Sequence, residues 1–154
     1  MSDPWLTIVG LGEDGLVGLS EASLAALTAA RIIFGGPRHL DLVGAGARGR
    51  AWPVPFSVDP ILAEKAKGNV VVVTSGDPFW YGAGGSLSQV LSPAEWIAHP
   101  APSTFAHAAA RMGWRIEDTN CIGLHAAPFE RLRPHLTNGQ RFICLLRDGS
   151  APAE

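Results

Sequence analysis

The most constraining feature of the sequence is an uninterrupted run of valines at residues 70–73. A strand with one solvated face alternates apolar and polar residues, whereas a continuous apolar run is typical of a strand buried on both faces, as in a parallel sheet. Further strand-like runs are separated by segments with helical spacing, at residues 5–9, 31–34, 95–99, 121–125 and 141–146. This alternation predicts an α/β fold with a mostly parallel sheet and flanking helices.

The 154-residue chain is 47% apolar and 17% charged, which is enough apolar material for a packed core. We expect two lobes, an N-terminal α/β lobe over residues 1–115 and an incomplete second α/β lobe over residues 116–154. Only two strand-like runs fall in the second range, and the last of them is followed by a few residues without a covering helix. The sequence therefore favours a fragment with a truncated C-terminal lobe.

Charge, hydropathy and residue spacing argue against several classes of function. The net charge is −2 and no run of Lys or Arg is present, so a nucleic-acid footprint is not expected. No apolar stretch approaches the ~18 residues of a membrane span, and no signal peptide is apparent. The histidines lack metal-ligand spacing, so no metal is predicted. Cys121 and Cys144 lie in apolar runs, as expected for buried thiols of a cytoplasmic protein.

A glycine-rich segment follows the first strand-like run. Gly10, Gly12 and Gly15 satisfy G-x-G-x-x-G, the pattern of dinucleotide-binding folds. That pattern also requires an acid at the end of the second strand to hold a ribose, yet glycines follow residues 31–34 here. Glu13 and Asp14 would also repel a pyrophosphate. A nucleotide-dependent oxidoreductase is therefore the weaker alternative.

A second candidate site follows the valine run, in the stretch SGDPFWYG at residues 75–82. Ligands of open α/β sheets bind beyond the carboxyl ends of the strands. Asp77 could accept hydrogen bonds from a ligand there or attract a cation, and the aromatic residues 79–81 could line an apolar slot. Alternatively, Asp77 is the N-cap of the next helix and the aromatic side chains fill the core. The residues alone leave both interpretations open.

Four segments in order, IVGLGEDG, FGGPRHL, SGDPFWYG and APSTFAHAAARMGW, resemble the tetrapyrrole methylases, the class III S-adenosylmethionine-dependent methyltransferases. GGPRHL and GLHAAPFERLRP resemble the cobalamin-pathway branch that methylates a precorrin macrocycle at C5. The resemblance implies a cytoplasmic enzyme with a two-lobed α/β fold that holds S-adenosylmethionine between its lobes. It also implies a decarboxylating, C15-methylating C-terminal domain in the full-length protein and a capacity for homo-oligomers.

The resemblance also assigns residues. It implies cofactor contacts at Gly76, Asp77, Pro78, Trp80, Ser103, Thr104, Leu124 and His125. It implies substrate contacts at Gly10, Gly12, Arg38 and His39, with Arg48 and Arg50 as further partners for substrate carboxylates, unless these side chains form only a solvated basic loop. Ala126 and Ala127 stand where members of the branch often carry glycine and arginine, which removes one expected substrate contact.

Methyl transfer from a sulfonium requires no covalent enzyme intermediate, so catalysis is expected to come from positioning, a contribution of up to about 7–11 kcal/mol. A base could remove a proton after transfer, and the sequence does not choose among Asp77, Glu13 and His125. The remaining alternative is a fragment without activity of its own.

Overall fold

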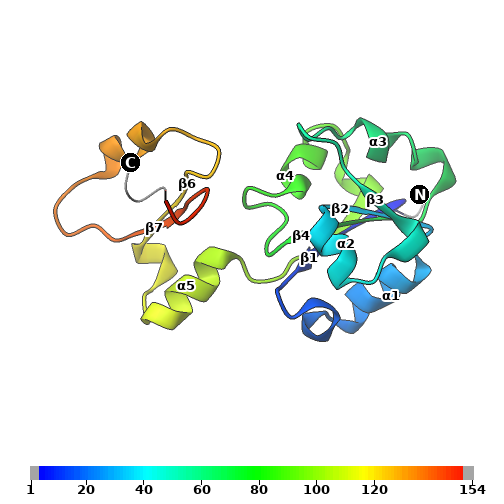
Figure 1. Ribbon diagram of the computed structural model, residues 1–154, viewed down its shortest axis with the longest axis horizontal. Helices are drawn as coiled ribbons and strands as arrows, with labels where there is room; N and C mark the ends of the chain where they lie inside the picture. Colours follow the sequence, from blue (N-terminus) through cyan, green and yellow to red (C-terminus); the bar gives the residue numbers. More distant parts are fainter. Residues whose placement is uncertain (1–3, 151–154) are drawn as a thin grey trace. The chain divides into compact units, whose positions relative to one another are not determined.

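The computed structural model describes residues 4–150. The chain divides into two compact units, residues Met1–Ser103 and Thr104–Glu154. Figure 1 shows that each unit combines helices with a sheet, and each is described by itself below. The α/β class expected from the alternating strands and helices is confirmed.

The first unit contains a five-stranded parallel sheet in the order β3-β2-β4-β1-β5. Its strands are β1 (Leu6–Leu11), β2 (Ile32–Gly35), β3 (Gly49–Ala51), β4 (Val70–Ser75) and β5 (Trp96–His99). The valine run forms β4, which lies between β1 and β2 and pairs Val73 with Val9. The parallel sheet inferred from this run is therefore confirmed.

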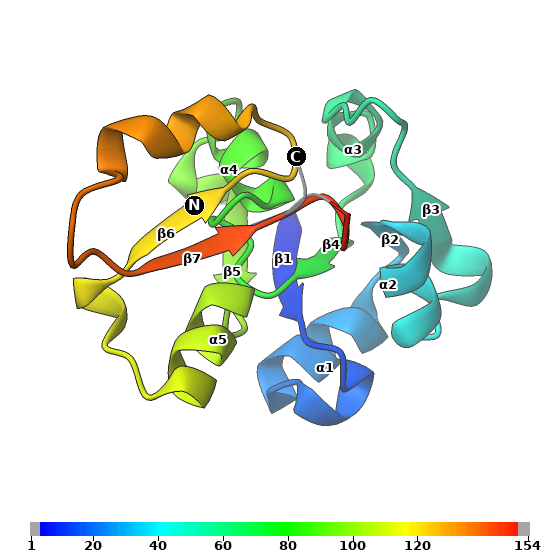
Figure 2. The same cartoon turned by 60° about the vertical axis from the view of Figure 1, so that its left-hand side comes forward.

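Both faces of the sheet are covered, as Figure 2 shows. Val71 and Val73 pack in a cluster with Leu27 of α1 (Glu21–Ala29), flanked by Leu40 of α2 (Pro37–Leu42). Val70 and Val72 point to the opposite face and pack with residues of α3 (Asp59–Leu62) and α4 (Ala83–Ser88). All four valines are at most 2% exposed, because successive residues of one strand supply both cores.

Local sequence signals position the helices. Ser20 is the N-cap of α1 and accepts a hydrogen bond from the Ser23 N–H at 3.2 Å, as the Ser-Glu start predicts. Pro37 begins α2, where its missing N–H costs nothing. Asp59 and Pro60 have the side-chain chemistry of an N-cap and a first turn, so the sequence predicts Asp59 as the N-cap of α3, and this prediction is wrong. Val58 is the N-cap, and the Asp59 N–H donates to the Ser57 hydroxyl at 3.1 Å.

Arg48 stabilises the end of α1. Its Nη1 donates to the carbonyl oxygens of Leu27 at 2.9 Å and Ala30 at 2.8 Å. These are carbonyls that a helix leaves without intrahelical partners. Arg50 donates to the carbonyl oxygens of Ala47 and Gly49. Both guanidinium groups thus bind the protein's own backbone through Nη1, and their contact with substrate carboxylates stays a prediction.

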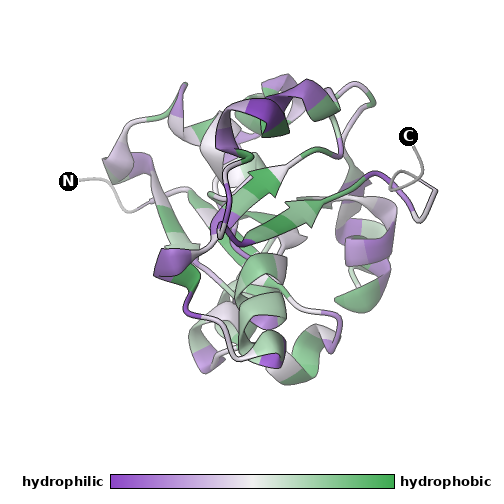
Figure 3. Cartoon of the chain, turned by 90° about the vertical axis from the view of Figure 1, so that its left-hand side faces the viewer, coloured by the Kyte–Doolittle hydropathy of each residue, from purple (hydrophilic) through white to green (hydrophobic). Residues whose placement is uncertain are grey.

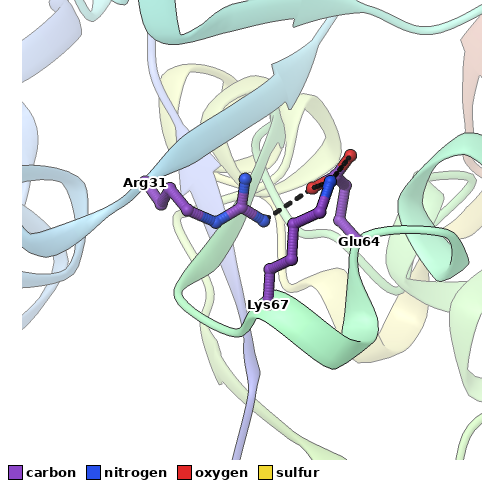
Figure 4. Close-up of polar contacts among 3 residues, drawn as sticks. All are labelled: Arg31, Glu64 and Lys67. Atoms are coloured by element: carbon purple, nitrogen blue, oxygen red, sulfur yellow. Dashed lines mark hydrogen bonds and ion pairs between the residues drawn. The ribbon is translucent and has the colours of Figure 1, made fainter.

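Ion pairs gather where the strands begin. Arg31, just before β2, contacts the Glu64 carboxylate at 2.7 Å, and Lys67 approaches the same group at 3.3 Å (Figure 4). The arginine and glutamate are distant in sequence, so the pair connects the start of β2 to the segment that follows α3. Partly exposed pairs of this kind contribute about 0–1 kcal/mol each.

Glu95 binds three partners at the same end of the sheet. Its carboxylate accepts hydrogen bonds from the Trp5 indole at 3.3 Å and the Ser92 N–H at 2.9 Å, and it pairs with Lys65 at 2.5 Å. The contact with Lys65, followed by that with Ser92, lowers the pKa of Glu95 to about 2 from an ordinary value of 4.5. The charged form is therefore favoured in the folded state.

We expect Glu95→Gln to flatten the acid limb of the stability curve. Because the folded-state pKa is depressed, the stabilisation is complete above pH 4.5 and is lost as the pH falls towards 2. Urea midpoints measured across this window should fall less steeply in the variant than in the unmodified chain. Glu21→Gln, in the first turn of α1, is the matched control. Identical slopes in the variant and the unmodified chain would contradict the assignment.

The second unit is smaller. It contains α5 (Thr104–Met112) and two parallel strands, β6 (Asn120–Gly123) and β7 (Phe142–Leu145). The strands are among its most hydrophobic segments (Figure 3), and Phe105, Ala109 and Ile143 form its buried cluster. Cys121 and Cys144 are half-buried free thiols, and burial raises the pKa of both.

Two features of the second unit differ from the sequence-based expectation. The segment FERLRPHL follows the strand-like run at residues 121–125, and the sequence predicts a helix in it; the structure has a 3-10 helix there, Phe129–His135, with Pro134 inside it. Proline has no N–H to donate and disfavours a regular α-helix. The division between units precedes α5, whereas the expected lobe boundary follows residue 115, because Phe105 and Ala109 of α5 pack with Ile143 of β7.

Within residues 4–150, no helix combines the length and the apolar character needed to cross a membrane.

Candidate functional site

The candidate site of the first unit lies where the parallel strands end. The Gly76 N–H, just after β4, donates to the Leu11 carbonyl at the end of β1 at 2.9 Å. The Gly76 carbonyl accepts a hydrogen bond from the Ala101 N–H, after β5, at 3.2 Å. These bonds hold three separate chain segments together at the carboxyl edge of the sheet, where ligands of open α/β sheets bind.

Gly10 and Gly76 allow these segments to approach closely. A Cβ on Gly10 would lie 2.1 Å from the Gly76 carbonyl oxygen and 2.5 Å from the Ala101 nitrogen. Gly76 has φ +58°, and a Cβ there would meet the Pro102 carbonyl oxygen at 3.1 Å. Gly10 is therefore needed for the fold itself. Its contact with a macrocycle stays a prediction.

The turn after β4 is tightly packed. Pro78 is fully buried, and Cβ atoms on Gly82 and Gly84 would lie 2.5 and 2.8 Å from its carbonyl oxygen. The half-buried Asp77 accepts a hydrogen bond from the Phe79 N–H through Oδ1 at 2.9 Å. The N-cap of α4 is Gly82, so Asp77 stabilises its own turn and does not cap the helix. Its carboxylate retains acceptor capacity for further hydrogen bonds.

The three aromatic residues after this turn are all partly exposed to solvent. Phe79 packs on Trp96 with ring centroids 5.3 Å apart, beside the α3 and α4 face of the sheet. Trp80 is 40% exposed and Tyr81 is 54% exposed. Tyr81 adopts φ 58°, a left-handed conformation that is uncommon outside glycine. Phe79 is also 40% exposed, so the interpretation that the aromatic side chains fill the core is wrong for all three rings.

Arg38 and His39 lie in α2, directly after the carboxyl end of β2. Arg38 forms an ion pair with Glu13, and the two side chains are 70% and 72% exposed. His39 is half-buried, and its Nδ1 has no hydrogen-bond partner among the described residues. Burial, and then the charge of Arg38, lowers the pKa of His39.

Gly12 lies in the loop between β1 and Gly15, where a Cβ would come within 2.5 Å of Asp14 Oδ1. The carboxylates of Glu13 and Asp14 thus sit in the same loop as the glycines. An acidic loop of this kind disfavours a pyrophosphate, which agrees with the argument against a dinucleotide site.

In the second unit, a pocket of about 350 Å³ lies at the carboxyl ends of β6 and β7. Leu124 is buried in it, and its N–H donates to the Leu145 carbonyl at 2.8 Å. The pocket is lined by Leu124, His125, Ala126, Ala127, Pro128, Phe129, Glu130 and Arg147.

The residues expected to bind cofactor fall in both units. Gly76, Asp77, Pro78, Trp80 and Ser103 belong to the first unit, and Thr104, Leu124 and His125 belong to the second. Leu124 and His125 share one pocket, while Thr104 begins α5. No group of three His, Cys, Asp or Glu side chains among residues 4–150 is arranged to hold a metal.

Comparison with known proteins decides the family. The family model for tetrapyrrole (corrin/porphyrin) methylases matches residues 5–153, nearly the whole chain. The chain belongs to the tetrapyrrole methylase family. The precorrin-6Y C(5,15)-methyltransferase [decarboxylating] of a Sinorhizobium species is 39% identical over 98% of this tetrapyrrole methylase chain, which spans 37% of that relative's length. The cobalt-precorrin-7 C(5)-methyltransferase of Salmonella typhimurium is 30% identical over 84% of the chain and 67% of its own length.

Solved structures support the same tetrapyrrole methylase fold. The precorrin-6Y methylase of cobalamin biosynthesis from Archaeoglobus fulgidus has a TM-score of 0.72 at 24% identity, covering 92% of this chain and 73% of that one. The methyltransferase CobJ has a TM-score of 0.67 at 26% identity, covering 87% of this chain and 62% of that one.

Sequence reasoning missed three contributors to these sites in the tetrapyrrole methylase chain. Ala101 binds the Gly76 carbonyl through its backbone, which no side-chain pattern reveals. Tyr81 has a positive φ without the glycine or asparagine that usually signals one. Arg147 lines the pocket beside Leu124, and only the pairing of β6 with β7 brings the two together.

Proposed function

We propose that this chain carries the S-adenosylmethionine-dependent C5 methylation of a precorrin macrocycle in cobalamin biosynthesis. The observation that carries the proposal is the extent of the two curated matches. One relative is named for methylation at C5 and C15 and the other for C5 alone, and the same chain aligns with both over most of its length. C5 methylation is the activity that both names share, so we assign it to the shared segment.

The residues of the carboxyl edge suit S-adenosylmethionine, which carries a cationic sulfonium, an ammonium group and a hydroxylated ribose. Asp77 is a half-buried carboxylate whose turn is fixed by the Phe79 N–H. A carboxylate in such a place favours a cation or accepts ligand hydrogen bonds. In the first unit, the further cofactor contacts that we propose are Gly76, Pro78, Trp80 and Ser103. In the second unit, they are Thr104, Leu124 and His125.

The bound cofactor would supply an electrophilic methyl group, and the chain's residues would position the acceptor carbon against it. The rigid turn over the buried Pro78 limits the movement of Asp77. Arg38, with its planar fork of donors, suits a substrate carboxylate, while Gly10, Gly12 and His39 are the further substrate contacts that we propose. Preorganised geometry of this kind can contribute about 7–11 kcal/mol at most.

Three candidates for removing a proton after transfer remain, Asp77, Glu13 and His125. Glu13 is engaged by Arg38, so Asp77 and His125 are the first to test. We further propose that the protein acts in the cytoplasm, forms a homo-oligomer and is joined in the full-length protein to a decarboxylating, C15-methylating domain. The share of the Sinorhizobium relative that the chain leaves uncovered is consistent with such a domain.

Equilibrium dialysis with labelled S-adenosylmethionine and NAD tests the proposal. The 154-residue chain is compared with the same chain joined to the residues that follow the matched region in the Sinorhizobium relative. We expect the extended chain to bind S-adenosylmethionine but not NAD and to transfer methyl to a precorrin, and the shorter chain to bind weakly and not turn over. NAD binding would favour an oxidoreductase, and no binding by either chain would favour a segment without activity.

A further inference from the structure

The Glu13–Arg38 ion pair lies at the carboxyl edge of the first unit. A contribution to the stability of the fold explains this pair poorly. It joins the loop after β1 to the first turn of α2, and both side chains are largely solvent-exposed, at 72% and 70%. Exposed pairs contribute about 0–1 kcal/mol, so this one adds little to stability. A weak, accessible pair can exchange partners at small cost.

Arg38 has a distinct position among the cations of this unit. The other Lys and Arg side chains precede strands, bind backbone carbonyls or lie within an edge strand; they are Arg31, Arg48, Arg50, Lys65 and Lys67. Arg38 alone among the Lys and Arg of residues 4–103 follows the carboxyl end of a strand, the side where ligands of this fold class bind.

The neighbours of Arg38 sharpen its role. His39 adds no second cation near neutral pH, because burial and the charge of Arg38 lower its pKa. Glu13 and Asp14 make the adjoining loop acidic, and Asp41 lies one turn along α2. An anionic ligand that approaches this edge therefore meets one guanidinium already occupied by a carboxylate.

We propose that Glu13 serves as a substitute carboxylate, which holds Arg38 until a carboxylate of the macrocycle displaces it, so that the pair selects anionic tetrapyrroles. Displacement exchanges one guanidinium–carboxylate contact for another, so the penalty is small for a carboxylated ligand. A ligand without a carboxylate would gain nothing in return for breaking the pair. This inference rests on the proposed function, and it makes Glu13 a specificity-determining residue rather than a base.

Fluorescence titration with uroporphyrin III, without S-adenosylmethionine, tests the inference on the 154-residue chain and its extended form. We expect Glu13→Gln to bind about two- to fivefold more tightly, since it removes the competing carboxylate. Arg38→Ala should bind about tenfold or more weakly, since it removes the charged partner. The double variant should match Arg38→Ala, because Glu13 acts only through Arg38.

Asp41→Asn is the matched control, because it removes the same charge within one turn of Arg38. It should change affinity less than Glu13→Gln, and urea midpoints should show that all variants fold. Three results would overturn the inference. They are equal changes in affinity for Glu13→Gln and Asp41→Asn, weaker binding of uroporphyrin III by Glu13→Gln, and no binding by any form of the chain. Methyl transfer to a precorrin is measured separately. If Glu13→Gln binds uroporphyrin III more tightly and Arg38→Ala binds it more weakly, but no methyl transfer is detected, only the proposed function is refuted.

Discussion

Replacing Gly10 by alanine is expected to destabilise the first unit by about 3 kcal/mol or more, or to prevent it from folding. The new Cβ would lie 2.1 Å from the Gly76 carbonyl oxygen and 2.5 Å from the Ala101 nitrogen. Both are backbone atoms, joined to each other by a hydrogen bond, so neither can move aside as a flexible side chain would. Urea unfolding followed by far-ultraviolet circular dichroism measures the effect.

Gly85→Ala is the matched control for this prediction. Gly85 lies in α4, and a Cβ there would meet nothing within 4 Å. Alanine at such a helical position is expected to be neutral or to stabilise by about 0.4–1 kcal/mol. Equal unfolding midpoints for the Gly10 and Gly85 variants would show that the three segments at the carboxyl edge do not pack as described.

Asp77→Asn is expected to weaken S-adenosylmethionine binding about 10- to 100-fold in the extended chain while changing stability by less than about 0.5 kcal/mol. The amide oxygen of asparagine can still accept the Phe79 N–H bond, so the turn keeps its hydrogen bond. The negative charge is lost, and hydrogen bonds to charged groups contribute about 1.5–3 kcal/mol. Equilibrium dialysis gives the affinity and urea unfolding gives the stability.

Two further variants separate the charge of Asp77 from its turn. Asp77→Ala should lose both affinity and stability, since the Phe79 N–H then has no side-chain acceptor. Asp59→Asn, at the start of α3, removes the same charge from another turn and should leave affinity unchanged. If Asp77→Asn instead kept its affinity and lost several kcal/mol of stability, Asp77 would serve the turn alone.

The fold was predictable because its signals are local. Burial of the valine run on both faces follows from its composition, and the structure places alternate valines in two different cores. Ser20 and Pro37 identify the starts of α1 and α2 because capping depends on a few neighbouring residues. The helix predicted at residues 129–136 is a 3-10 helix, because Pro134 has no N–H to donate to a regular α-helix.

The site was only partly predictable, because several of its contacts join residues remote in sequence. The role of Arg48 depends on where α1 ends, and the role of Phe79 depends on Trp96 at the start of β5. Neither contact leaves a pattern in the neighbouring residues. The same reason explains why the sequence left open whether the aromatic side chains after Asp77 fill the core, whereas the structure leaves all three partly exposed.

The sequence by itself determined the α/β class, the parallel strands, the turn at Asp77 and the family resemblance, since each depends on residues close together along the chain. Only the tertiary structure decided that Gly10 lies beneath the bond between Gly76 and Ala101, and that Glu13 holds Arg38. Strand order produces both contacts, because a parallel sheet brings the carboxyl ends of separate strands to one edge. Order among strands is set by the summed packing of whole elements, which short sequence patterns do not encode.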